Sequence, residues 1–374
     1  SMLLTDQLHV ITQVNPFSII SNLFKTQDAN KVWKLINSKD YRWKKYWCSF
    51  YFSLLPEESI TKADAESLLE HLNNTPSNEL RNWLDFLFKY QTVDKEIYVK
   101  AVKLLVDKSK EDKNYAKSLG HIFSDNSEIF GSWFEIFKSD EKLIFDAYLA
   151  VFKIERYWDY KGKALDILTK RNTTFLGEIV DSIYDSERWP DSHTNMPELD
   201  FLWERDNFID DIEKYGKYVY HKEKDSYGIG DNIFCKLFLK EKGRNEAEEL
   251  IEKKQSFIKH TILNNIDDIK YSCFIFNLAN YMSEDFRREL LSLFLQGNNN
   301  YNDFQTLDYE FTTRSWSGSR VPILEREKNY LASILPLFNS VELLEHRAYV
   351  EEQIEHKIKS IEYEKKIDFL ESRH

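Results

Sequence analysis

The sequence has little glycine and proline, with ten glycines and seven prolines among 374 residues. Folds that bind nucleotides or phosphate use glycine where the backbone turns tightly or approaches the ligand closely. Gly228 and Gly230 are the only close glycine pair, but they lack the third glycine and the preceding strand of a dinucleotide-binding motif. No Walker A pattern occurs in the sequence. These absences argue against the common nucleotide-dependent enzymes, and we predict no bound cofactor.

Cysteine is also scarce, and metal-binding patterns are absent. Cys48, Cys235 and Cys273 are odd in number and far apart in apolar runs, which predicts buried thiols in a reducing compartment. Neither a CxxC nor an HExxH pattern occurs, and His346 and His356 of one predicted helix are ten residues apart. That spacing is too wide for a shared metal ion. We therefore predict no metal site.

Positive charge is in the minority, because 51 lysines and arginines stand against 63 aspartates and glutamates, for a formal net charge of −12. Nucleic-acid binding takes clustered positive charge, so we predict no general nucleic-acid binding, although a local basic face is compatible with this balance. No apolar run reaches the roughly 18 to 20 residues needed to span a bilayer, and no apolar leader opens the sequence. We expect a cytoplasmic protein that does not associate with membranes.

Amphipathic helical periodicity is abundant. Hydrophobic residues make up 42% and aromatic residues 15% of the sequence, which excludes a disordered chain. The densest aromatic segment repeats at helical spacing through Trp43, Tyr46, Trp47, Phe50, Tyr51 and Leu54. Similar patterns, without a fixed repeat length, continue along the sequence. They predict an all-α fold, an irregular α-solenoid of stacked helix pairs, with a multi-helix bundle in two subdomains as the alternative.

Capping residues and prolines divide the later sequence into expected helices. These helices cover about residues 125–137, 139–152, 162–170, 173–184, 197–220, 245–263, 283–295 and 322–338. The asparagine-rich tract 297–303 predicts a turn or loop. The prolines and polar residues of 185–200 predict a boundary between an N-terminal helical-repeat subdomain, 1–185, and a C-terminal helical subdomain, 198–374.

The boundary segment contains the one catalytic pattern that we identify. Arg188 and His193 have the R-x4-H spacing of the HEPN ribonuclease family, in which an arginine and a histidine serve RNA cleavage. The resemblance covers six residues, and Pro190 places them in a loop, whereas the family has them on a helix. The resemblance implies an alternative function, an RNA-processing or defence nuclease, with Arg188 and His193 as its candidate catalytic residues.

A second loop has the composition of a recognition site. Arg314 and Arg320 flank a small Ser/Gly segment around Trp316. Backbone N–H groups and guanidinium groups in such a loop can hold an anion or a peptide. A connector anchored by the tryptophan is the other interpretation. We name Arg314, Trp316 and Arg320 as candidate binding residues.

The last expected helix begins at Ser340 and extends nearly to His374. It is highly charged and carries a thin apolar stripe of Val350, Ile354, Ile358, Ile361, Ile367 and Leu370. Such a stripe suits a helix that caps the fold, and it also suits one that pairs with a partner helix. The sequence leaves both interpretations open.

Irregular helix pairs in an acidic chain resemble the HEAT-like helical-repeat sensor and scaffold regions of large bacterial proteins, such as the NTPases of antiphage defence. The resemblance is one of general character and transfers no functional residue. It implies a non-enzymatic scaffold or sensor that binds a protein partner and acts in antiphage defence. The sequence leaves the identity of that partner and the oligomeric state open.

Overall fold

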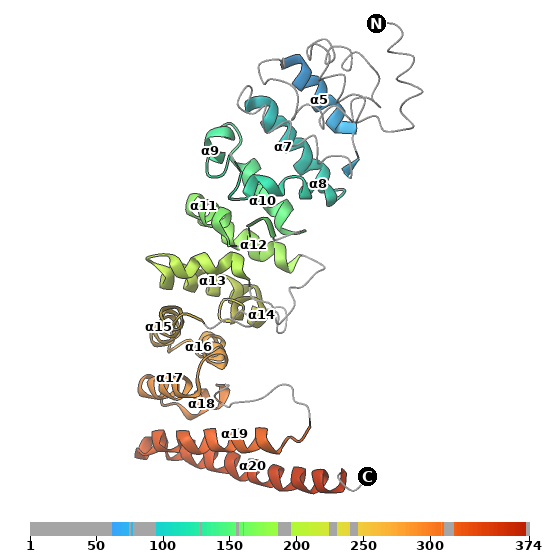
Figure 1. Cartoon of the computed structure of the whole chain (residues 1–374). Helices are drawn as coiled ribbons and strands as arrows, with labels where there is room; N and C mark the ends of the chain where they lie inside the picture. Colours follow the sequence, from blue (N-terminus) through green and yellow to red (C-terminus); the bar gives the residue numbers. More distant parts are fainter. Residues whose placement is uncertain are drawn as a thin grey trace, which may run out of the picture. The chain divides into compact units, whose positions relative to one another are not determined.

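A computed structural model gives the structure of the chain (Figure 1). The residues that it describes are 62–74, 76–77, 95–127, 129–154, 157–159, 161–185, 196–223, 230–239, 246–307, 309 and 318–371. The chain divides into two compact units, unit 1 at Ser1–Arg188 and unit 2 at Trp189–His374. Every regular element of the described residues is an α-helix or a 3-10 helix, which confirms the predicted all-α fold.

Unit 1 consists, in its described part, of helices joined by short turns. These elements are α5 (Lys62–Asn74), α7 (Lys95–Ser109), α8 (Asn114–Lys117), η3 (Gly120–Phe123), α9 (Trp133–Ile136), α10 (Lys142–Phe152), η4 (Tyr157–Asp159), α11 (Lys163–Arg171) and α12 (Phe175–Tyr184). The predicted aromatic helix around residues 43–54 lies outside the described residues.

Helix α10 organises the described part of unit 1, because it packs against α7, α8 and η3 and also against α12. The buried face of α10 comprises Leu143, Ile144, Phe145, Ala147, Tyr148, Val151 and Phe152. The buried face of α7 comprises Ile97, Tyr98, Ala101, Val102, Leu105 and Val106. In both helices the buried positions recur every three or four residues, which leaves the opposite face of each helix to solvent.

Aromatic rings fill the core between these elements. The ring centroid of Phe123 lies 5.0 Å from that of Tyr148 and 5.6 Å from that of Trp133. The Trp133 indole N–H donates a hydrogen bond of 3.1 Å to the carbonyl oxygen of Ile122, so its polar atom is satisfied inside the core. Edge-to-face ring pairs of this kind stabilise a core beyond the apolar area that they bury.

Unit 2 continues with longer helices. Its described elements are η5 (Pro197–Glu204), α13 (Phe208–Glu223), α14 (Gly230–Cys235), α15 (Glu248–Asn264), α16 (Ile269–Phe276), η6 (Asn277–Tyr281), α17 (Glu284–Gly297), α18 (Tyr301–Thr306), α19 (Val321–Ile334), η7 (Leu335–Phe338), η8 (Val341–Leu343) and α20 (Leu344–Glu371).

The helices of unit 2 pack mainly against their neighbours in the sequence. Helix α13 contacts α14, α15 contacts α16, and α19 contacts α20, while α15 also contacts α13 and α17. Within unit 2, Figure 1 shows these pairs following one another in chain order. This is the packing of stacked helix pairs, in which each pair covers the apolar face of the next.

The core of unit 2 includes a cluster of rings around Phe234, which is fully buried. Its ring centroid lies 5.7 Å from Tyr215 and Phe238, 6.1 Å from Phe257 and 5.5 Å from Phe274. These rings come from α13, α14, α15 and α16 and from the turn after α14, so one cluster ties two successive helix pairs together.

Helix α20 covers the end of unit 2. It packs against α18, α19, η7 and η8, and Val350 and Ile361 of its predicted stripe are buried. Ile358 of the same stripe is 43% exposed and Leu370 is 61% exposed. The capping role predicted for this helix therefore applies to one of its faces, and the other face remains available.

Two expected helices differ from the structure. The pattern at 125–137 predicts one helix, but Gly131 has a φ of 81° and the segment forms turns around the single-turn helix α9. The pattern at 197–220 predicts another, but Arg205 is extended between η5 and α13. The Arg205 guanidinium pairs with Asp211 at 2.9 Å and lies 4.9 Å from the Phe201 ring, which stabilises this break.

The asparagine-rich tract 297–303 is only partly the predicted loop. The side-chain oxygen of Asn300 accepts hydrogen bonds from the backbone N–H groups of Asn302 at 2.9 Å and Asp303 at 3.1 Å. Asparagine is a preferred N-cap residue for this reason, and the short helix α18 begins directly after it.

None of the described helices is both long enough and apolar enough to cross a membrane. Of the predicted buried thiols, Cys235 is buried in unit 2, whereas Cys273 is only half-buried. The Cys273 sulfur lies 3.5 Å from the carbonyl oxygen of Thr306. Cys48 lies outside the described residues.

Candidate functional site

Most of the site residues predicted from the sequence fall outside the described residues, namely Arg188, His193, Arg314 and Trp316. Arg320 is described and is the half-buried N-cap residue of α19 in unit 2. Both sequence-based sites therefore stay predictions. The described residues contain a different candidate site, in unit 1.

A cleft of about 680 Å³ opens in unit 1 among the C-terminal end of α7, the turn before α8, helix α10 and the C-terminal end of α12. The charged residues that line it are Lys110, Lys113, Lys142, Lys153, Asp146 and Asp185. The apolar residues that line it are Val106, Leu149, Ala150 and Ile154. Four lysines beside four apolar residues make this cleft a basic site with an apolar surface.

Helix α10 supplies the longest side of the cleft. Lys142, Asp146, Leu149 and Lys153 follow one another at intervals of four, three and four residues. That spacing places them on one face of a helix. Because the other face of α10 is buried in the core, these four side chains are held at the surface by packing elsewhere on the same helix.

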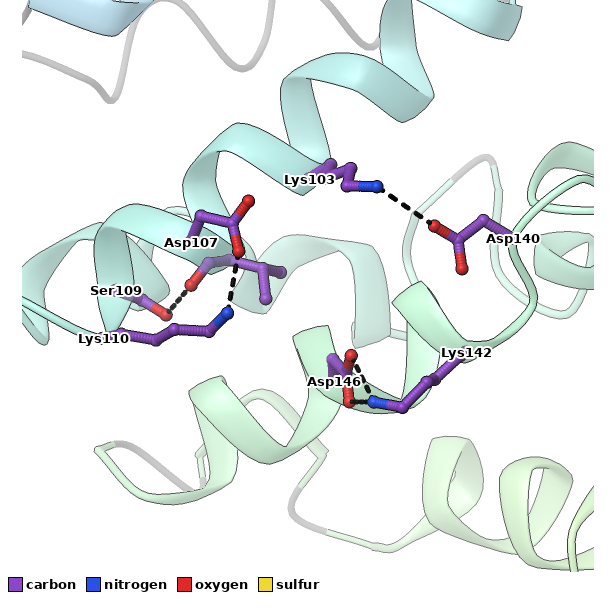
Figure 2. A network of polar contacts seen from close by, with 8 residues as sticks. Lys103, Asp107, Ser109, Lys110, Asp140, Lys142 and Asp146 are labelled. Atoms are coloured by element: carbon purple, nitrogen blue, oxygen red, sulfur yellow. Dashed lines mark hydrogen bonds and ion pairs between the residues drawn. The ribbon is translucent and has the colours of Figure 1, made fainter.

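Two of the lysines are paired with carboxylates (Figure 2). Lys142 Nζ contacts both carboxylate oxygens of Asp146, at 2.6 and 2.7 Å. Lys110 Nζ contacts Asp107 Oδ1 at 2.8 Å, and this carboxylate raises the pKa of Lys110. Ion pairs at such an exposed surface contribute little to stability, because solvent screens them. Their effect here is to fix where the two ammonium groups lie.

The other two lysines have no ion-pair partner among the described residues. Lys113 is the N-cap residue of α8, and Lys153 is the C-cap residue of α10, where its own backbone N–H bonds to the carbonyl oxygen of Leu149. Both side chains are exposed. Asp185, the C-cap residue of α12, also lines the cleft and has no ion-pair partner in the part of the chain that the structure describes. The cleft therefore retains positive charge that its own carboxylates do not neutralise.

The hydroxyl groups of the cleft are engaged with their own helices. Ser109 Oγ donates to the carbonyl oxygen of Val106 at 2.6 Å, and Ser182 Oγ donates to that of Ile179 at 2.8 Å. The described lining contains no histidine or cysteine. What the lining offers to a ligand is ammonium groups for anions and apolar side chains for hydrophobic groups.

Among the described residues, no group of three or more His, Cys, Asp and Glu side chains is placed to hold a metal ion.

Sequence reasoning missed this cleft because its walls come from helices that are far apart in the sequence. The signal it left is local: Lys142, Asp146 and Lys153 lie on one face of a predicted helix. By itself that pattern is typical of any solvated helix face.

No protein-family model matches the sequence, and neither a curated protein nor a solved structure shows significant similarity to it.

Proposed function

We propose that this chain is a non-enzymatic scaffold or sensor that binds a protein partner, and that the cleft of unit 1 holds an acidic segment of that partner. The observation that carries the proposal is the pair of lysines, Lys113 and Lys153, that have no carboxylate partner among the described residues and lie beside the apolar lining of the cleft. Carboxylates would complete their ion pairs, and apolar side chains between those carboxylates would cover Leu149 and Ile154.

An acidic polypeptide fits this cleft better than a nucleic acid does. Asp146 and Asp185 lie in the same lining and would repel a continuous row of phosphates. The formal net charge of −12 opposes the approach of any long polyanion, whereas a short acidic segment meets the cleft locally. The apolar part of the lining offers nothing to phosphates and favours leucine-like side chains.

A role in antiphage defence, with a phage-derived protein as the captured segment, is part of the same proposal. Its support is the general resemblance of the sequence to helical-repeat sensor regions of bacterial defence proteins. Comparing the proteins captured by the chain from cells with and without phage challenge is the experiment that addresses this part.

The binding proposal is tested with a fluorescently labelled peptide of alternating aspartate and leucine, whose binding is measured by fluorescence anisotropy. We expect it to bind the full chain and to bind the double variant K113E/K153E at least about tenfold more weakly, because two attractions become repulsions. A peptide with lysine in place of aspartate and a single-stranded RNA of matched length serve as competing probes.

The matched control is the double variant K117E/K138E, which changes two exposed lysines of unit 1 that do not line the cleft. It alters the net charge by the same amount as K113E/K153E and should retain wild-type affinity for the aspartate–leucine peptide. Equal weakening in both variants would show that only the overall charge matters. Tighter binding of the RNA than of the peptide would overturn the assignment of the cleft to proteins.

A further inference from the structure

Helix α20 has one face packed on the rest of unit 2 and one face that points away from α19. The side facing the rest of unit 2 contains the buried His346, Val350 and Ile361, and the contacts of α20 are with α18, α19, η7 and η8. In Figure 1, α20 is the last layer of unit 2 and no described element of that unit lies beyond it. Its outer face is therefore uncovered in the described structure of unit 2.

Large apolar side chains remain exposed along this outer face. Tyr363 is 64% exposed and Leu370 is 61% exposed. Single exposed apolar residues are normal on soluble proteins. Tyr363 and Leu370 lie seven residues apart near the C-terminal end of α20, on the side where charged residues also follow a regular pattern.

One row of charges on the outer face is separated by sign along the helix, with Glu355 and Glu362 beside the row. Glu345, Glu352, Lys359 and Lys366 are spaced seven residues apart, which is close to two helical turns and places them on one face. The first two are acidic and the last two are basic. All four are exposed, and none has an ion-pair partner among the described residues.

This order of charges makes the face complementary to itself in the antiparallel direction. In one register of two antiparallel α20 helices, Glu345 lies opposite Lys366 and Glu352 lies opposite Lys359, and each pair occurs twice because the arrangement has twofold symmetry.

The same register aligns the exposed apolar residues. It places Ala348 opposite Tyr363, so that the exposed ring of one chain meets a small exposed side chain of the other. A parallel arrangement would instead place every charge opposite a like charge.

We propose that the outer face of α20 binds the same face of a second copy of this chain as an antiparallel helix pair. The helix has 28 residues and is thus about 42 Å long. One helix pair of that length is at the lower end of the size range of specific interfaces, so we expect a dimer with a dissociation constant in the micromolar range that weakens as salt is added.

A competing explanation is that the charges only complement the helix dipole, since acids near a helix N-terminus and bases near its C-terminus stabilise an isolated helix. That explanation predicts a monomer. It also predicts no consequence of mixing two variants, and the experiment is built on this difference.

The experiment compares two charge-reversal variants by sedimentation velocity from about 1 to about 200 μM, the range expected for a weak interface. In K359E/K366E the whole outer row is acidic, and in E345K/E352K the whole row is basic. Each variant alone should dimerise at least about tenfold more weakly than the wild type, because every contact becomes repulsive. An equimolar mixture of the two should form a heterodimer, because every cross-chain contact is then attractive.

Circular dichroism of each variant separates loss of pairing from loss of folding. A wild-type chain that is monomeric at 200 μM in low salt would overturn the proposal, and so would a mixture that fails to associate while both variants are folded.

Register and direction are tested by cross-linking. A348C mixed with Y363C should form a disulfide between the two chains under mild oxidation, whereas neither variant should do so with itself at those positions. A disulfide formed by Y363C alone at the introduced cysteine would indicate parallel pairing and contradict the proposed geometry.

Discussion

At the scale of single residues, the environment of the His121 imidazole disfavours its charged form. His121 lies in η3 of unit 1, and burial lowers its pKa from 6.5 to about 3. A histidine that stays neutral in the folded state but takes up a proton in the unfolded state makes stability depend on pH. Above pH 6.5 the histidine is neutral in both states and does not lower the free energy of unfolding. As the pH falls from 6.5 toward 3, only the unfolded state takes up the proton, so the free energy of unfolding decreases.

We expect the free energy of unfolding of the wild type to fall by about 2 kcal/mol from pH 7 to pH 5 because of this one group. H121Q removes the titration and should reduce that difference, while H356Q, which changes an exposed histidine of α20, should leave it unchanged. Urea unfolding at the two pH values, followed by circular dichroism, measures the difference. Equal pH dependence in H121Q and the wild type would contradict the assignment.

Residue-level signals explain why the candidate site was hard to predict. Lysines and aspartates on a helix face are common, and Lys113 and Lys153 become informative only when folding brings the end of α10 beside the turn before α8. The R-x4-H pattern of Arg188 and His193, by contrast, can be recognised from its spacing along the sequence. A cleft built from three helices leaves no such spacing.

At the scale of elements, glycine decides how closely α13 and α14 approach. A Cβ atom added at Gly216 would lie 2.7 Å from Cζ of Phe234, whose ring is fixed by neighbouring aromatic rings. Alanine is favoured over glycine inside a helix by about 1 kcal/mol, but overpacking a core costs about 1 to 3 kcal/mol. The steric term should exceed the helix-propensity gain here, because a buried ring has no space into which to move.

We therefore expect G216A to lower the free energy of unfolding by about 1 kcal/mol or more. Chemical denaturation of G216A, F234L and the double variant forms a double-mutant cycle. The smaller leucine should relieve the clash, so the double variant should be more stable than the sum of the single effects. A stabilised G216A, or strict additivity, would show that the two helices separate without cost.

Elements also show where sequence patterns succeed and fail. The spacing of apolar residues predicts α10, α11 and α17 well, because each of these short segments has both a regular apolar face and clear residues at its helix ends. It fails at 125–137, where apolar spacing continues across Gly131 although the chain turns there. It also fails at Asn300, where a residue typical of turns caps a helix instead. Helix caps and glycines with positive φ depend on local backbone conformation, which the spacing of apolar residues does not reveal.

At the scale of the whole molecule, the two units have separate sets of core residues. The ring cluster around Phe234 and the contacts among α13 to α20 all lie within unit 2, and the rings around Tyr148 lie within unit 1. In repeat-like architectures most stabilising contacts are between neighbours, so a piece that keeps complete helix pairs keeps most of its stability.

The fragment 189–374 should therefore fold by itself. We expect this fragment to have the circular dichroism of a helical protein and to unfold cooperatively. A fragment that begins at residue 231 lacks α13 and therefore Tyr215, so its Phe234 ring cluster is incomplete. We expect that shorter fragment to lose cooperative unfolding. Since α20 lies within unit 2, the fragment 189–374 should also self-associate with the salt dependence of the full chain. A fragment 189–374 that is unfolded would show that unit 2 depends on unit 1 for its stability, and a folded but monomeric one would separate the packing of α20 from its pairing.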